Sequence, residues 1–268
     1  MIKIKKAAVL FSIMAATILL ITSGCDKDNS SAQKTSYELK SKDVLGVTGT
    51  VTIIETSNTS ATIDIALANA PAGTHPAGLY MHTTVEEGAI VVALNPVDDS
   101  GKSSTLVSTM NYSQLISYDG CIKVLTSALA PEVIIAQADI GGNVITETRK
   151  TYNIGTVGIF GVSGTALFEQ RKNENTLVTI SLDGIIPGEF YPATINLGSV
   201  ATQGGGTVSK LLNSVNGTTG KSITNIRKLD NDLNITYNNW LVYSGYLNIY
   251  QTSVHAGNII AQGNIGSN

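Results

Sequence analysis

The chain has 268 residues, with 17 Lys and Arg against 20 Asp and Glu, and a formal net charge of −3. No cluster of basic residues follows residue 34, which argues against nucleic acid as a partner bound through neutralised phosphates. Only 14% of the residues are charged, and Gly, Thr, Ser and Asn are plentiful. This composition is typical of short strands joined by tight turns.

The first 24 residues have the pattern of an export signal. Three lysines precede an uncharged run over residues 7–22, which is shorter than the roughly 20 apolar residues that span a membrane. The run is followed by Gly24 and Cys25 in the sequence Thr-Ser-Gly-Cys, which resembles a bacterial lipobox. We therefore predict a lipoprotein signal peptide at residues 1–24 and lipidation of Cys25, with a plain secretory signal as the alternative.

The predicted anchor implies a location and a mature form. Two or more acyl chains hold a protein stably on a membrane, so the membrane is an expected partner and the outer membrane or cell surface the expected place. Residues 25–35 are mostly polar and are expected to form a flexible tether. Removing residues 1–24 leaves 268 − 24 = 244 residues, which suits two domains of about 100–120 residues.

The mature chain repeats itself in a fixed order. Residues 134–141 and 259–266 agree at six of eight positions and close the two copies. Earlier matches pair Gly46-Val47-Thr48-Gly49-Thr50 with Gly161-Val162-Ser163-Gly164-Thr165, Pro76-Ala77 with Pro192-Ala193, Gly101-Lys102-Ser103 with Gly220-Lys221-Ser222, and Tyr118-Asp119-Gly120 with Tyr243-Ser244-Gly245. The offset rises from 115 to 125. It therefore places insertions in the second copy, chiefly near residues 226–234.

The boundaries of the repeat predict the domains. We expect one β-domain at residues 36–142, a linker at 143–150 and a second β-domain at 151–268. Within each copy, seven or eight short runs alternate between apolar and polar residues, which favours an antiparallel β-sandwich or barrel. Residues 90–94 are expected to form a buried strand, and residues 112–116 a single helical turn capped by Asn111 or Ser113.

These repeated motifs resemble the CHRD domain, first named from chordin and common in bacterial secreted proteins and lipoproteins. The resemblance covers about residues 35–142 and 150–268. It rests on the Gly-x-Ser/Thr-Gly-Thr strand, the Pro-Ala segment, Asn95-Pro96-Val97 with its following hairpin, the Tyr-Asp-Gly turn and the closing octet. The resemblance implies two tandem Greek-key β-sandwiches related to the immunoglobulin-like and copper-zinc superoxide dismutase folds. It implies no established enzymatic activity.

The family's histidines are missing at six positions. They are Gly78, Tyr80 and Leu125 in the first copy, and Thr194, Asn196 and Tyr250 in the second. The three histidines present, His75, His82 and His255, fall at three different positions of the repeat. A zinc or copper site needs three or four converging ligands. We therefore expect no metal and no other cofactor, and interpret the three histidines as surface or rim residues.

Other candidate reactive groups also have plainer interpretations. Cys121 lies in a strand-like run and is expected to be a small buried residue rather than a catalytic thiol. The acidic pairs Glu86-Glu87 and Asp98-Asp99 lack the spacing of a calcium loop and are expected to be solvated turn residues. The aromatic group Tyr237, Trp240, Tyr243, Tyr246 and Tyr250 is either core or a binding face, with core favoured for Trp240 and Tyr246 and Tyr250 left open.

Two functions from different classes remain. The favoured one is a lipid-anchored, non-catalytic binding or structural module of the cell envelope, whose partner is an unknown envelope or extracellular protein or glycan. Its contacts are expected in loops that differ between the copies, at residues 83–88, 199–206 and the insertion after Ile226. The alternative is a degenerate superoxide dismutase-like metal or redox protein, which the missing histidines disfavour.

Overall fold

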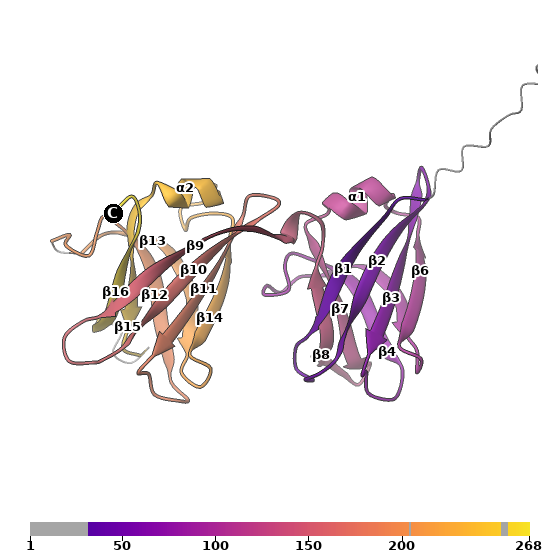
Figure 1. The fold of residues 1–268 in the computed structure, drawn as a ribbon, viewed down its shortest axis with the longest axis horizontal. Helices are drawn as coiled ribbons and strands as arrows, with labels where there is room; N and C mark the ends of the chain where they lie inside the picture. Colours follow the sequence, from indigo (N-terminus) through magenta and orange to yellow (C-terminus); the bar gives the residue numbers. More distant parts are fainter. Residues whose placement is uncertain (1–31, 204, 253–256) are drawn as a thin grey trace, which may run out of the picture. The chain divides into compact units, whose positions relative to one another are not determined.

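The computed structural model of the protein describes residues 32–203, 205–252 and 257–268. These residues are almost entirely β-structure and form two domains, which confirms the all-β, two-domain fold expected from the sequence (Figure 1). The predicted signal peptide, Cys25 and most of the predicted tether lie outside the described residues.

The first domain contains eight strands, one short helix and a closing 3-10 turn. In chain order they are β1 (Lys34–Ser41), β2 (Thr48–Ser57), β3 (Ser60–Ala68), β4 (His75–Met81), β5 (Ile90–Val97), β6 (Lys102–Val107), α1 (Tyr112–Ser117), β7 (Gly120–Ser127), β8 (Ala130–Asp139) and η1 (Gly141–Asn143). Strand β1 thus begins inside the range predicted as tether.

The second domain contains the corresponding elements in the same sequence. They are β9 (Ile145–Thr156), β10 (Ser163–Arg171), β11 (Thr176–Asp183), β12 (Phe190–Leu197), β13 (Val208–Asn216), β14 (Lys221–Ile226), α2 (Tyr237–Leu241), β15 (Ser244–Tyr250) and β16 (Ile259–Gly266).

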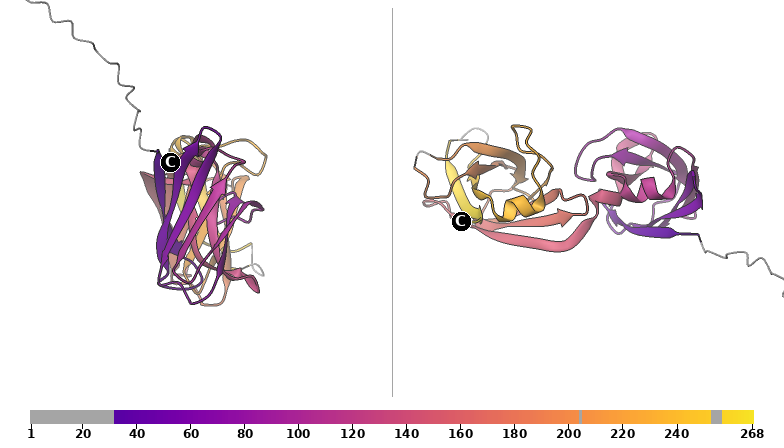
Figure 2. Two further views of the ribbon diagram at one scale, coloured as in Figure 1. Left: turned by 90° about the vertical axis from the view of Figure 1, so that its right-hand side faces the viewer. Right: turned by 90° about the horizontal axis from the view of Figure 1, so that it is seen from above.

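Both domains have the same strand order and only antiparallel pairs. The first sheet runs β5-β4-β7-β8-β1-β2-β3-β6, and the corresponding strands of the second run β13-β12-β15-β16-β9-β10-β11-β14. Strand β15 returns to lie beside β12 after the consecutive strands β12, β13 and β14, which is a Greek-key connection. The second sheet closes into a barrel where Asn216 pairs with Lys221. Seen from above, the strands of each domain curl around an interior (Figure 2).

Each domain encloses its own hydrophobic core. In β3 the side chains of Ala61, Ile63 and Ile65 are buried, as their alternation predicts, because every second side chain faces the interior. The second core contains a chain of edge-to-face aromatic contacts in which the ring centroids of Phe168 and Trp240 lie 6.0 Å apart. Trp240 and Tyr246 are fully buried, which confirms their predicted place in the core.

The two helices are short and each covers one end of its own domain (Figure 1). Helix α1 begins after Asn111, whose side chain accepts from the backbone N of Gln114 while the Gln114 side chain accepts in return. Helix α2 has the same capping box between Thr236 and Asn239. The predicted helical turn and its Asn111 cap are therefore confirmed.

A repeated asparagine joins β5 to β6 in the first domain, and β13 to β14 at the seam of the barrel in the second. The backbone N of Asn95 in β5 donates to Thr105 Oγ1 of β6 at 2.8 Å, and its Nδ2 donates to the Ser104 carbonyl at 2.6 Å. In the second domain Asn213 makes the same two bonds, to Thr224 Oγ1 and to the Ile223 carbonyl. These side chains link the two strands where backbone pairing is sparse, between β13 and β14, or missing, between β5 and β6.

Three local expectations need correction. Most of the expected linker, residues 143–150, belongs to β9, because these residues pair along β10 as far as Ile145 opposite Arg171. The run at residues 90–94 is a strand, but Ile90 and Val91 are exposed, because β5 is the end strand of its sheet. The insertion after Ile226 is an ordered hairpin, held by the pairing of Lys228 with Asn234.

Candidate functional site

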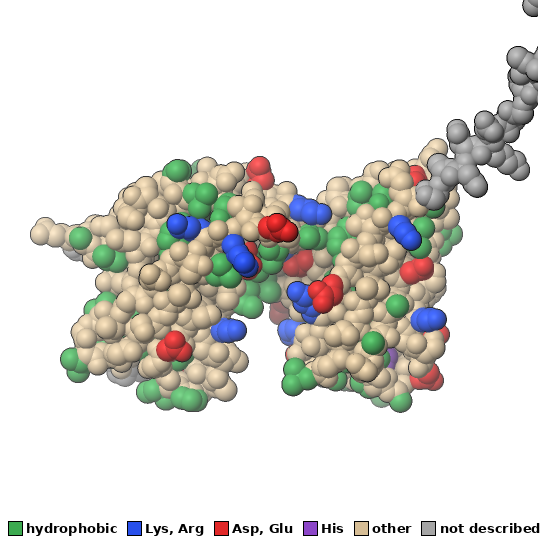
Figure 3. Space-filling model, viewed as in Figure 1, with side chains coloured by type: hydrophobic (Ala, Val, Ile, Leu, Met, Phe, Trp, Pro, Cys, Tyr) green, Lys and Arg blue, Asp and Glu red, His purple; other side chains and the backbone are tan. Residues whose placement is uncertain are grey.

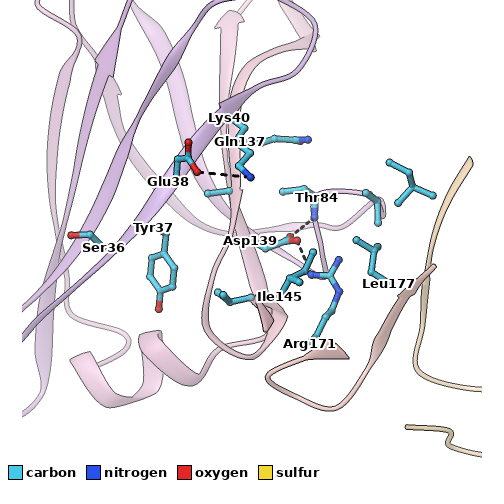
Figure 4. A pocket seen from close by; sticks show the side chains of 14 residues that line it. Ser36, Tyr37, Glu38, Lys40, Thr84, Gln137, Asp139, Ile145, Arg171 and Leu177 are labelled. Carbon is cyan, nitrogen blue, oxygen red and sulfur yellow. Dashed lines mark hydrogen bonds and ion pairs between the residues drawn. The ribbon is translucent and has the colours of Figure 1, made fainter. Parts of the chain in front are cut away.

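One candidate site is a pocket of about 460 Å³ where the second domain begins (Figure 4). Its walls come from β1, β8 and the β4–β5 connection of the first domain, and from β9, β10, β11 and β14 of the second. The lining includes the apolar residues Tyr37, Val85, Ala138, Val144, Ile145, Leu177 and Ile223. Polar groups from Ser36, Glu38, Lys40, Thr84, Gln137, Asp139 and Arg171 complete it.

Arg171, the last residue of β10, is the central charged group beside this pocket. Its side chain is fully buried, and its Nη1 donates to Asp139 Oδ2 at 2.7 Å and to the Asn143 carbonyl. Its Nε donates to Asn225 Oδ1 at 2.8 Å. A buried cation is tolerated only when it is paired and hydrogen-bonded. The register of β10 places Arg171 next to Asp139, at the end of β8, which supplies both the opposite charge and a hydrogen-bond acceptor.

The hydrogen-bond network continues from Arg171 to the β4–β5 connection. Asn225 Nδ2 donates to Glu86 Oε2 at 2.9 Å, and Thr83 Oγ1 donates to the same oxygen at 2.8 Å. Arg227 lies 3.8 Å from Glu86 Oε1 and contacts His82 Nδ1 at 3.1 Å. Residues of the β4–β5 connection and of the inserted hairpin, which differ between the copies, therefore join the two domains.

Two buried polar atoms beside the pocket lack a hydrogen-bond partner within the described part of the chain. They are Arg171 Nη2 and Gln137 Oε1. Both atoms are closed off from solvent. A ligand that enters without displacing side chains therefore meets the apolar walls and the rim charges of Lys40 and Glu38, which pair with each other at 3.8 Å. Such a surface can bind, but it offers no activated nucleophile.

A second, more polar pocket of about 370 Å³ lies against the hairpin. Its charged lining residues are Lys210, Arg227, Lys228, Glu86, Asp230 and Asp232, so the three cations and three anions cancel. Lys210 Nζ pairs with Asp230 Oδ1 at 2.8 Å. Because the charges balance in number, the lining of this pocket carries no net formal charge.

Reasoning from the sequence alone did not find the Arg171 network. By the repeat offsets of 115 and 119, Arg171 and Asn225 correspond to Thr56 and Leu106 of the first copy, which are both exposed. The sequence does contain a signal for this network: at two aligned strand ends, the second copy has an arginine and an asparagine where the first copy has Thr56 and Leu106. In the sequence, the partner Asp139 stands out only as part of the closing octet, residues 134–141.

The six positions where the CHRD resemblance would place histidine have different surroundings in the two domains. In the second domain, Thr194 Oγ1 donates to Asn196 Oδ1 at 2.6 Å and lies 3.4 Å from Tyr250 Oη. In the first domain, the Ile90 and Tyr80 side chains lie against Gly78. The second-domain residues therefore come together, but as a hydrogen-bonded cluster of neutral groups.

Two of the three histidines serve the fold, and the expectation of surface residues was wrong for His75. Its ring is buried, with Nδ1 2.8 Å from the Thr126 carbonyl and Nε2 2.9 Å from the Pro71 carbonyl. It corresponds to Tyr191, whose hydroxyl accepts from the backbone N of Ile186. His82 contacts Arg227 at the junction, and His255 lies outside the described residues.

Cys121 is a buried core residue, as the sequence indicated. Burial raises the pKa of its thiol to about 12, and the nearby carboxylates of Asp139 and Glu86 add to the rise. The reactive form of cysteine is the thiolate. This thiol therefore stays protonated and unreactive near neutral pH.

The two acidic pairs occupy different environments. Asp98 Oδ1 accepts from Ser100 Oγ at 2.6 Å and from the backbone N of Lys102, and these bonds hold the pKa of its carboxyl below its usual range. Asp99 accepts from the backbone N of Gly73. Both are turn residues, as expected, whereas Glu86 belongs to the junction.

Across residues 32–268, apart from residues 204 and 253–256, no three His, Cys, Asp or Glu side chains lie close enough to share a metal ion. Neither helix in that part of the chain has the length and apolar character needed to cross a membrane. Comparisons with protein-family models, curated proteins and solved structures found no match.

Proposed function

We propose that the protein is an exported lipoprotein, anchored through Cys25 to the outer membrane or the cell surface, with two tandem CHRD-like domains. It acts as a non-catalytic binding or structural module of the cell envelope. Its partner is an envelope or extracellular protein or glycan. The proposal rests on the charged start, the apolar run and the lipobox-like Thr-Ser-Gly-Cys of the sequence, together with the duplicated all-β fold.

One observation supports a non-catalytic role: each candidate reactive side chain is buried or already hydrogen-bonded within the protein. The His75 ring contacts two carbonyls, the Cys121 thiol is buried, and Glu86 accepts from Thr83 and Asn225. Catalytic groups need free access to a substrate and a protonation state suited to the reaction. These side chains instead stabilise turns, core and junction.

The face drawn in Figure 3 fits a partner that is recognised by shape and hydrogen bonds. Charged side chains lie dispersed among uncharged polar side chains and backbone. A dispersed pattern gives little long-range attraction to a polyanion. Of the loops expected to carry binding, the β4–β5 connection and the hairpin serve the junction, so we place the contacts on the remaining exposed surfaces.

Lipidation is tested by following radiolabelled palmitate in cells that make the natural chain or Cys25→Ser. The natural chain should carry label and pellet with membranes, and the variant should lose both. A Ser23→Ala variant keeps the cysteine and a small residue, and serves as the matched control. Labelling and membrane association that survive in Cys25→Ser would contradict the anchoring proposal.

The metal or redox alternative is tested by elemental analysis of the purified mature chain after dialysis. Our proposal expects far less than one equivalent of zinc or copper. A stoichiometric metal that resists chelators would overturn the proposal and favour the dismutase-like alternative.

A further inference from the structure

The inserted hairpin of the second domain covers an edge of β13. The hairpin is closed by the backbone N of Leu229 donating to the Leu233 carbonyl. From it, the backbone N of Asp230 donates to the Ser209 carbonyl at 3.0 Å. In return, the backbone N of Leu211 donates to Asp230 Oδ2 at 2.7 Å. Two outward backbone groups of β13 are thus satisfied by a neighbouring segment of the same chain.

The first domain has no such segment. Between β6 and α1 lie residues 108–111, and between β14 and α2 lie residues 227–236, so the connection is shorter by 10 − 4 = 6 residues. Because Gly78 pairs with Ala93 as Thr194 pairs with Leu211, Ala93 of β5 corresponds to Leu211. By the same register Val91 corresponds to Ser209.

The corresponding edge of β5 is open in the first domain. β5 is the last strand of its sheet and pairs only with β4. On its free side, β5 is hydrogen-bonded to β6 from Asn95 onwards. Among the described residues, none forms a hydrogen bond with the Val91 carbonyl or the Ala93 backbone N on that side. Ile90 is 53% and Val91 39% exposed. Unpaired backbone groups along an exposed strand are a template for another strand.

We propose that this open edge of β5 binds an extended segment of a partner polypeptide by strand addition. The segment donates a backbone N–H to the Val91 carbonyl, as Asp230 does to the Ser209 carbonyl on β13. A backbone carbonyl of the segment accepts from the Ala93 N–H, where Asp230 uses its carboxylate to accept from Leu211. This inference rests on the proposed binding function and names its partner class: a peptide strand rather than a glycan.

The surroundings of the edge favour an aliphatic segment. On β13, Lys210 pairs with the Asp230 carboxylate, but the corresponding residue of β5 is Val92. Without that cation, an acidic side chain gains no ion pair here, and Ile90 and Val91 instead present apolar surface. The free edge is also short, because Asn95 is already bonded to β6 and Pro96 has no N–H to offer. A short edge suits one short strand better than an extended pairing between two copies.

Amide hydrogen exchange on a chain of residues 26–268, which contains every described strand, tests whether the edge is open. The Ala93 amide should exchange at least about tenfold faster than the Leu211 amide, because hydrogen bonding protects an amide from exchange. Equal protection in dilute protein would overturn the proposal. Protection of Ala93 that rises with protein concentration alone would show that a second copy covers the edge, and would also overturn it.

Peptide binding is tested with the peptide Thr-Val-Thr-Val-Thr, blocked at both termini, and NMR titration monitors its binding. The peptide should shift and protect the Ala93 amide, and a peptide N-methylated at its central Thr and both Val residues should bind about tenfold more weakly or not at all. N-acetylglucosamine serves as the glycan probe. Binding of the sugar at this edge without binding of the peptide would overturn the proposal.

Two variants make the binding test specific. Ala93→Pro removes the edge N–H at a position where an edge strand tolerates proline, and should weaken peptide binding about tenfold. Replacing residues 108–111 with residues 227–236 should graft the hairpin over β5 and abolish binding. Unchanged binding in both variants, while circular dichroism shows that both are folded, would refute the proposal. None of these outcomes depends on lipidation, so failure here is distinct from failure of the anchoring test.

Discussion

At the scale of single residues, the fully buried Arg171 is a side chain whose loss should be costly. Its truncation removes the donor to Asn225 Oδ1 and the cation paired with Asp139 Oδ2. Within the described part of the chain, Asp139 then keeps only the backbone N of Thr84, which donates to its Oδ1 at 2.7 Å. Breaking a buried ion pair from one side typically costs about 3–5 kcal/mol, because the remaining charge is unpaired. We expect Arg171→Ala to lower the free energy of unfolding by that amount, measured by urea denaturation of residues 26–268.

The matched control for this prediction is Arg227→Ala. Its side chain is half exposed and lies 3.8 Å from Glu86, so its loss should cost about 0–1 kcal/mol. Equal costs for the two variants would show that Arg171 is no more important than a surface arginine.

Cys121 supplies a pH-dependent prediction. Its pKa is raised from 9.0 to about 12 in the folded chain, so the folded state holds this proton more tightly than the unfolded state. The resulting stability is fully present below pH 9 and is lost as pH rises towards 12. Burial raises the pKa of Tyr37, Tyr152 and Tyr237 as well, which gives the same sign.

We therefore expect the free energy of unfolding to fall between pH 8 and pH 10.5, and to fall less steeply in Cys121→Ala. Native Cys121 should also resist a thiol reagent at pH 8 until urea unfolds the chain. Rapid labelling of the folded protein would contradict the buried, protonated thiol.

At the scale of elements, the capping boxes decide where the two helices begin. Thr236→Ala removes the side-chain oxygen that accepts from the backbone N of Asn239, and should cost about 1 kcal/mol. Asn238→Ala, at an exposed position of the same helix, should leave stability unchanged or slightly higher, because alanine is the better helix former. Thermal unfolding of both variants compares them directly, and an equal loss would contradict a capping role.

The sequence predicted those elements whose signals are local. The alternation around Ile63 and the Asn111 cap depend on neighbouring residues, and the repeat offset located the insertion. Contacts between distant residues were out of reach: Arg171 lies 32 positions from Asp139, and the bond from Asn95 to Thr105 depends on how β5 meets β6. The exposed face of β5 was missed for the same reason, because exposure depends on which strand ends the sheet.

At the scale of the whole molecule, the Arg171 network joins the two domains. The network connects β8 and the β4–β5 connection to β10 and β14, so unfolding of one domain strips partners from buried groups of the other. We expect residues 26–268 to unfold in one calorimetric transition, and Arg171→Ala to separate it into two. Two well-resolved transitions in the unmodified chain would contradict this coupling.

We propose that the lipid-anchored chain holds a partner polypeptide at the open edge of β5. The most direct test places a photoreactive amino acid at Val91 in the native cells and irradiates them. We expect a crosslinked polypeptide in the membrane fraction from Val91 and no such product from the exposed Phe190 of the second domain. The product should be lost when the hairpin is grafted over β5. Absence of any product from Val91, or the same product from both positions, would contradict it.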